Sequence, residues 1–144
     1  MCAAIVHAVG ANVNGTNDQG QTPIHLAIGS GSGCLSVFSD LMDRKPDLDV
    51  LDGKELSPLH TAVSLAGNQQ FPHAEDMAIL IIDSGRAGLN LRSGNRQTAL
   101  VMAIKRPRPR VVMALVRAKA DTNMPDEHGT APLHLVLTVV QSGG

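Results

Sequence analysis

Aromatic residues and cysteines are scarce in this 144-residue chain, which contains two Phe, no Trp or Tyr, and two Cys. Proteins that bind single-stranded nucleic acids stack the bases on aromatic side chains, so the composition argues against a nucleic-acid partner. Cys2 and Cys34 are too few for a disulfide scaffold or a four-cysteine zinc site. We therefore expect a reducing, intracellular location, either cytoplasmic or nuclear.

Long apolar runs are missing as well. The runs at residues 77–82 and 133–140 fall far short of the roughly 18 residues that a membrane span requires. The apolar residues 1–11 lack the basic start of a signal peptide. Hydrophobic residues make up 43% of the chain and charged residues 17%, which favours a folded core over disorder. We expect one domain that does not contact membranes.

Acidic residues are absent from a long window. Residues 86–119 contain nine Lys or Arg and no Asp or Glu, although the net charge of the chain is −1. Residues 1–72 hold three basic and seven acidic side chains, and residues 73–144 hold nine basic and six acidic ones. The small total therefore conceals an acidic-to-basic gradient along the chain.

The chain does contain an internal repeat. Four segments align: Thr22-Pro23-Ile24-His25, Ser57-Pro58-Leu59-His60, Thr98-Ala99-Leu100-Val101 and Ala131-Pro132-Leu133-His134. A second column precedes each segment by eight residues and consists of Asn14, Asp49, Asn90 and Asn123. The distance from one unit to the next varies, so insertions fall after the aligned segments. A repeat of this period predicts a solenoid.

Each unit is predicted to contain a tight turn followed by two helices. Thr22 and Ser57 stand before proline and are expected to cap a helix. Apolar residues at helical spacing predict the inner helices: Ile24, Ala27 and Ile28, then Leu59, Ala62 and Val63, then Leu100, Ala103 and Ile104. Outer helices are predicted at residues 35–41, 77–82 and 111–116.

The repeat resembles the ankyrin-repeat family. Thr22-Pro23-Ile24-His25-Leu26-Ala27 and Ser57-Pro58-Leu59-His60-Thr61-Ala62 match its T-P-L-H-x-A signature, and residues 10–14 are similar to its G-A-x-V-N segment. The resemblance covers nearly the whole chain and implies an all-α helical repeat solenoid with short β-hairpin fingers. One domain, residues 1–144, is then divided into a partial unit 1–16, units 17–51, 52–92 and 93–125, and a truncated unit 126–144.

Some units depart from the family pattern. Glu55 and Arg96 stand where Gly20 occupies the turn of the first unit, and Ala99 replaces the proline. The second unit is roughly eight residues longer than usual, and we expect the excess within residues 66–76. A recognition loop and a tolerated surface insertion are both compatible with this excess.

Catalytic and metal-binding arrangements are not recognisable. His25, His60 and His134 occupy equivalent positions in separate units, so we expect each to bond backbone between adjacent units rather than to share a metal. Residues 29–33 are glycine-rich but lack the lysine of a phosphate-binding loop. We predict no catalytic residue, no metal, no cofactor and no enzyme activity.

The resemblance implies protein binding through the concave face of the solenoid. That face is formed by the finger tips and the exposed side of the inner helices. Carried over residue by residue, the partner-binding positions are Leu51, Lys54, Leu56, Leu65, Arg92, Asn95, Gln97, Lys105, Arg106, Glu127 and His128.

Leucines dominate the binding positions of the second unit and cations those of the third. Exposed leucines beside Arg92, Lys105 and Arg106 predict a protein partner with an apolar anchor next to acidic residues. The alternative is that one or two of these leucines pack under the finger while the charges are merely solvated.

The basic run at residues 105–110 has three interpretations. It is a charged turn between helices, a contact for an acidic peptide, or a nuclear-targeting or nucleic-acid patch. The absence of interleaved aromatic residues argues against nucleic acid. Pro107 and Pro109 argue against a regular helix through the run.

The predicted function is a noncatalytic interaction module acting as a scaffold, adaptor or inhibitor. Two alternatives are an I-kappa-B-like regulator that binds a transcription factor and an intramolecular structural spacer in a larger multidomain protein. The inner helix predicted at residues 132–140 has no outer helix to cover it, and terminal repeats normally need a polar cap. We therefore expect a fragment of a longer array or association of copies through uncapped ends.

Overall fold

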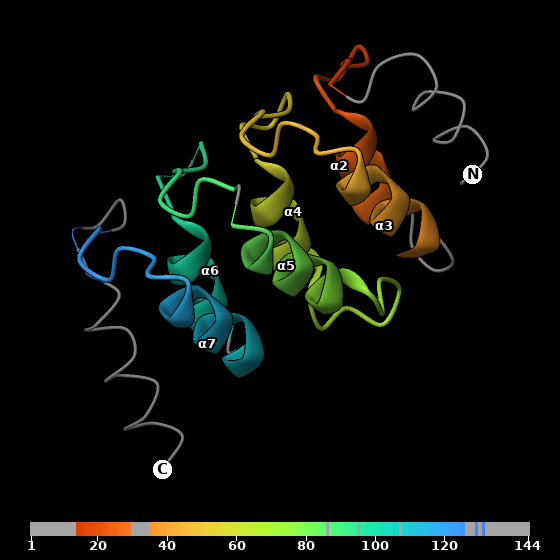
Figure 1. Cartoon of the computed structure of the whole chain (residues 1–144). Helices are drawn as coiled ribbons and strands as arrows, with labels where there is room; N and C mark the ends of the chain where they lie inside the picture. Colours follow the sequence, from red (N-terminus) through yellow and green to blue (C-terminus); the bar gives the residue numbers. More distant parts are fainter. Residues whose placement is uncertain are drawn as a thin grey trace.

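The fold consists of helix pairs stacked in a row. The structure is a computed structural model that describes residues 14–29, 35–85, 87–94, 96–106, 108–125, 129 and 131. Within these residues the helices are α2 (Pro23–Ile28), α3 (Leu35–Asp43), α4 (Pro58–Leu65), α5 (Ala74–Asp83), α6 (Ala99–Lys105) and α7 (Pro109–Arg117). The pairs α2 and α3, α4 and α5, and α6 and α7 stand side by side (Figure 1).

The inner helices α2, α4 and α6 begin at the predicted caps. Pro23 and Pro58 are the first helical residues after Thr22 and Ser57, where a missing N–H costs nothing. The Ser57 Oγ accepts a hydrogen bond from the His60 N–H at 3.3 Å. Thr98 makes the equivalent bond to the Val101 N–H at 3.3 Å, so the cap persists in the unit without proline.

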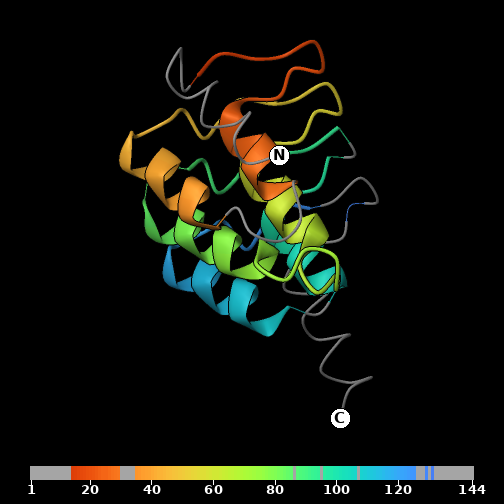
Figure 2. The ribbon, with the colours of Figure 1, turned by 90° about the vertical axis from the view of Figure 1, so that its right-hand side faces the viewer.

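Two layers of helices enclose the core. Figure 2 shows α3, α5 and α7 as one layer, with the inner helices and the fingers on the other side. The predicted inner-helix positions are confirmed, since they are at most 4% exposed from Ile24 to Ile104. Phe38 and Leu41 from α3 and Leu115 from α7 complete the same cluster. These residues confirm an all-α repeat solenoid, and burial of each large side chain contributes about 1.5–3 kcal/mol.

The outer helices are longer than predicted. Helix α5 begins at Ala74 and α7 at Pro109, earlier than the apolar runs indicate, because acidic residues and proline suit the first turn of a helix. The excess of the second unit lies where it was expected, in the segment 66–73 between α4 and α5. One further residue is inserted after Gly85, where the chain leaves the outer helix.

Several predictions fall outside the described residues. They concern the partial unit before residue 14, Pro107, His134 and the inner helix at 132–140. The described residues include no strand, so the fingers are hydrogen-bonded turns. No helix among the described residues is long and apolar enough to cross a membrane.

Candidate protein-binding face

The first two fingers are each closed by the side chain of their first turn residue. The Asn17 Oδ1 accepts hydrogen bonds from the backbone N–H groups of Gln19 and Gln21 at 2.9 and 3.0 Å. Asp52 repeats this pattern in the second finger, accepting from Lys54 and Leu56 at 2.8 and 3.0 Å. These bonds hold the turn before any partner binds, so the finger is preorganised.

A left-handed residue completes every described finger. Gly20 and Gly129 have φ of 74° and 78°, and the predicted turn positions Glu55 and Arg96 have φ of 59° and 60°. The repeat alignment therefore identified two non-glycine residues in a conformation that favours glycine. Glu55 and Arg96 therefore adopt the same backbone conformation as the glycines, although this conformation is unfavourable for residues with a side chain.

Neighbouring fingers are joined at their tips. The Gly53 N–H donates to the Gln19 carbonyl oxygen at 2.7 Å, and the Gly94 N–H donates to the Glu55 carbonyl oxygen at 3.2 Å. A Cβ on Gly53 would lie 2.8 Å from the Gln19 oxygen, so this approach requires glycine. A cleft of about 330 Å³ lies between the first two fingers and is lined by polar residues, among them Lys54.

Buried histidines connect the inner helices α2 and α4 to the next finger. The Nε2 of His25 lies 2.9 Å from the Leu56 carbonyl oxygen, and the Nε2 of His60 lies 3.0 Å from the Gln97 carbonyl oxygen. Because a carbonyl only accepts, Nε2 carries the proton in both rings. The Thr22 N–H then donates to the Nδ1 of His25 at 3.2 Å. The predicted role of these two histidines between units is confirmed.

Burial keeps both imidazoles neutral. It lowers the pKa of His25 and His60 from the ordinary 6.5, because a charged ring loses its hydration inside the stack. The hydrogen bond to Leu56 and the charge of Asp52 oppose this effect on the pKa of His25. The neutral form is also the one that fits the hydrogen bonds, since a proton on Nδ1 would remove the acceptor.

The second column of the repeat forms a ladder between units. The side-chain oxygens of Asn14, Asp49 and Asn90 each accept a hydrogen bond from a backbone N–H of the following unit at 2.7 Å. The donors are Asp47, Gly88 and Asp121. The constant spacing of eight residues marked this column, but its contact with the next unit was not predicted.

The predicted partner-binding residues divide into three groups. Leu51, Lys54, Arg92, Lys105 and Arg106 are exposed. Leu56, Leu65 and Gln97 are half-buried. Asn95, Glu127 and His128 lie outside the described residues. The described positions therefore lie in or next to the second and third fingers and at the ends of α4 and α6.

The three leucines differ in their surroundings. Leu51 is 41% exposed at the start of the second finger. Leu65, at the end of α4, packs against the hydrophobic core. Leu56 bonds through its backbone to both His25 and Asp52, so it belongs to the frame of the finger. Leu51 is thus the leucine that offers the most apolar surface to a partner.

The basic run of the third unit reaches back to the second unit. The Arg106 Nη1 donates to the Ser64 carbonyl oxygen at 2.7 Å. The Arg108 guanidinium lies so close to Gly67 that a Cβ there would overlap it. These two contacts join the run to the end of α4 and to the segment 66–73. They favour its interpretation as a charged turn between helices, which here also contacts the preceding unit.

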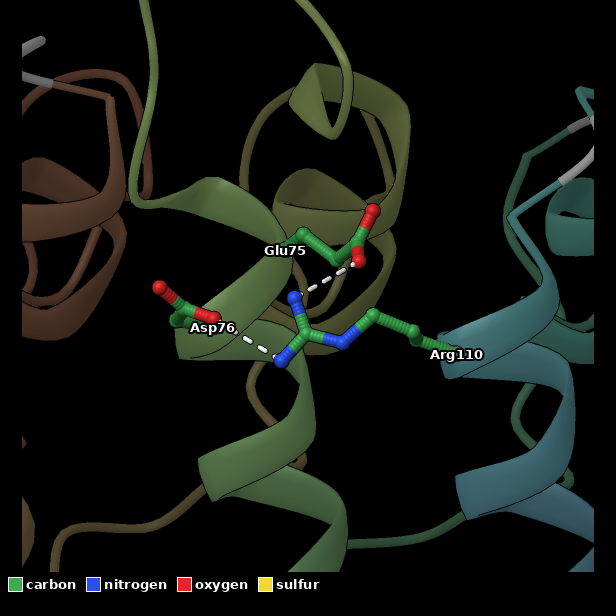
Figure 3. A network of polar contacts seen from close by, with 3 residues as sticks. All are labelled: Glu75, Asp76 and Arg110. Atoms are coloured by element: carbon green, nitrogen blue, oxygen red, sulfur yellow. Dashed lines mark hydrogen bonds and ion pairs between the residues drawn. The ribbon is translucent and has the colours of Figure 1, made fainter.

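Arg110 makes a third contact of the same kind. Its guanidinium lies 3.1 Å from the Glu75 Oε1 and 3.2 Å from the Asp76 Oδ1. Figure 3 shows this side chain crossing from α7 to the first turn of α5. Sequence analysis did not predict this contact, because Asp76 and Arg110 are 34 positions apart and no local sequence pattern indicates such a pairing.

The described residues contain no group of three His, Cys, Asp or Glu side chains that could hold a metal. What the face offers instead is rigid backbone, one exposed leucine and several cations. Such a surface binds by shape, apolar contact and charge.

Comparison with known proteins gives relatives over most of the chain. No family model matches. Rabankyrin-5 of Homo sapiens is 35% identical over 138 residues, which are 93% of this chain and 11% of that protein. Inversin of Canis lupus familiaris is 29% identical over 92% of this chain and 12% of its own length. The neurogenic locus notch homolog protein 1 of Xenopus laevis is 28% identical over 88% and 5%. The chain thus spans about an eighth or less of these ankyrin-repeat proteins.

Proposed function

This chain belongs to the ankyrin-repeat family, and we propose that its fingers and inner helices bind a protein partner noncovalently. The observation that carries the proposal is the exposure of Leu51 beside cationic positions. Lys54 lies on the same finger, and Arg92 occupies in the third finger the position that Leu51 has in the second. Interaction sites are typically apolar surface rimmed by polar or charged residues, and Leu51 is the most exposed of the three leucines at the proposed binding positions.

The stacking of units sets the spacing that a partner would need. Neighbouring helices pack about 8–10 Å apart, and a chain in the polyproline II conformation advances about 3.1 Å per residue and returns to the same face every three residues. Leu51 and Arg92 are therefore about three partner residues apart. The proposed partner segment has an apolar side chain that contacts Leu51 and an acidic side chain, about three residues away, that pairs with Arg92.

Preorganisation supports this role. The turn bonds of Asp52, the tip bond of Gly53 and the bridge from His25 to Leu56 fix the second finger from three sides. A rigid finger loses little conformational freedom on binding, so more of the contact energy remains as affinity. The backbone of the face is then fixed, whereas the exposed side chains of Leu51 and Arg92 can change conformation to fit a partner.

A peptide selection tests the proposal without a known partner. A displayed random peptide library is selected on the immobilised chain, and selected peptides are measured by fluorescence polarisation. We expect an apolar and an acidic residue at the stated spacing. Leu51→Asp and Arg92→Glu are each expected to weaken binding by at least about tenfold, as loss of a hot spot does.

Matched controls lie on the outer helices. Leu80 has an exposure of 43%, close to the 41% of Leu51, and Arg117 is an exposed cation as Arg92 is. Leu80→Asp and Arg117→Glu are expected to change the peptide affinity by less than about twofold. Peptides that lose affinity with the controls and keep it with Leu51→Asp would contradict the proposed face.

The alternatives derived from the sequence differ in what occupies this face. A scaffold, an adaptor, an inhibitor and an I-kappa-B-like regulator would all use this face on another protein. An intramolecular spacer would cover it with a segment of its own protein. These cases are separated by whether the selected peptide pattern occurs in the same polypeptide or in another protein.

A further inference from the structure

The outer helices carry apolar surface that the proposed binding face does not use. Leu80 on α5 is 43% exposed, and Met113 and Val116 on α7 are 53% and 49% exposed. A groove of about 450 Å³ runs between α5 and α7 and is lined by Ile79 and Met113 among others. Figure 2 shows that this layer lies on the side away from the fingers.

Opposite charges border this groove at two levels. Helix α5 contains acidic residues and no basic ones, whereas α7 contains basic residues and no acidic ones. Asp76 and Arg110 form the first level, where they are paired at 3.2 Å. Asp83 and Arg117 each follow seven residues later, roughly two helical turns along, and form the second level.

The second level is available for new contacts. Asp83 and Arg117 are both exposed, and neither has an ion-pair partner within the described part of the chain. The apolar side chains of Ile79 and Met113 occupy equivalent positions between the two levels. The face therefore reads acidic, apolar, acidic along α5 and basic, apolar, basic along α7.

We propose that this outer face binds a second copy of the chain in a symmetric dimer. A two-fold axis that lies in the groove, parallel to the helices, places α5 of each copy on α7 of the other. Asp83 then meets Arg117 of the second copy, and Ile79 meets its Met113. Each contact occurs twice, because a two-fold interface repeats every pair.

Charge complementarity favours this occupant over others. Placing α5 on α5 would oppose acidic residues, and placing α7 on α7 would oppose arginines. Only the exchange of α5 and α7 places an acidic residue opposite an arginine at both levels, and a second copy provides that pattern at the matching spacing. The inference is independent of the proposed peptide-binding face, which uses other residues.

Sedimentation equilibrium of the whole 144-residue chain tests the dimer. The measurement extends to about 0.5 mM, so that weak association through a small interface is also detected. We expect a shift from the monomer mass of 15.1 kDa to twice that mass as the concentration rises. Met113→Asp is expected to keep the chain monomeric.

Charge exchange between two variants gives the sharper test. Asp83→Arg and Arg117→Asp each oppose like charges across the axis, so each variant alone is expected to remain monomeric. An equimolar mixture restores two opposite-charge pairs and is expected to form a heterodimer. The matched control Asp18→Arg, on the first finger, is expected to dimerise as the wild type does and not to rescue Arg117→Asp.

Three results would overturn the proposal. The wild-type chain could be monomeric at every concentration, dimers could persist in both charge variants, or the mixture could fail to dimerise. Circular dichroism confirms that each variant is folded, which is expected because the substituted side chains are exposed. Dimers that persist in Met113→Asp would place self-association on another surface.

Discussion

Acidification should destabilise this protein through two buried histidines. His25 and His60 are 2% and 1% exposed, and burial lowers the pKa of each below 6.5. In the unfolded chain both histidines bind protons as the pH falls through 6.5, whereas in the folded chain they bind protons only at lower pH. Stability is therefore fully present above pH 6.5 and declines below it until the folded pKa is reached.

The size of the effect follows from the two sites. A histidine that stays neutral in the folded chain at pH 5.5 lowers the free energy of unfolding by at most about 1.4 kcal/mol relative to pH 7.5, since one pKa unit corresponds to about that energy. For the two histidines together, the upper limit of the loss in the free energy of unfolding is about 3 kcal/mol. The charge of Asp52 reduces the share of His25, because it raises the pKa of that ring.

Urea unfolding followed by circular dichroism measures this loss at both pH values. The double variant His25→Gln with His60→Gln keeps an N–H donor near Leu56 and Gln97 but does not titrate, so its pH dependence should be smaller than that of the wild type. His73→Gln is the matched control, because His73 lies outside both bridges. Equal losses of stability in the wild type and the double variant would refute the reasoning.

Further substitutions test the frame of the fingers. Glu55→Gly relieves a φ of 59° and is expected to raise the free energy of unfolding by roughly 0.5 kcal/mol, net of the entropy that glycine adds to the unfolded chain; a lower urea midpoint would contradict this. Gly53→Ala places a Cβ 2.8 Å from the Gln19 oxygen and is expected to lower the free energy of unfolding by about 1–3 kcal/mol in the same assay. Asn90→Ala removes the acceptor of the Asp121 N–H, at an expected cost of about 1 kcal/mol.

The periodic features of the fold were predictable from the sequence. Burial of Ile24, Ala27 and their equivalents follows from helical spacing, and the left-handed turns at Glu55 and Arg96 follow from alignment with Gly20. Such features recur in every unit because the same local physics acts in each. A motif that is weak evidence in one unit therefore becomes reliable when it recurs at the same position in several units.

Contacts between units were harder to predict. The bond from Arg106 to Ser64 joins residues 42 positions apart, and only the second and third units contain this pair. A contact of this kind does not recur at equivalent positions, so comparison of the repeats cannot reveal it. The apolar positions of the binding face were ambiguous for a related reason, because the fold of the finger, rather than the composition, leaves Leu51 exposed and half-buries Leu56.

Dimerisation and peptide binding together predict a bivalent protein. The proposed axis runs parallel to the helices, so both sets of fingers lie at the same end of the dimer while the two inner-helix faces turn outward. A surface coated with the selected peptide should retain such a dimer strongly, since the second contact is intramolecular. Met113→Asp, which leaves Leu51 intact, should weaken retention on that surface by at least about tenfold and leave the affinity for free peptide unchanged. An equal loss for free peptide would mean that Met113 acts on the finger face itself, and unchanged retention would mean that the two faces do not act together.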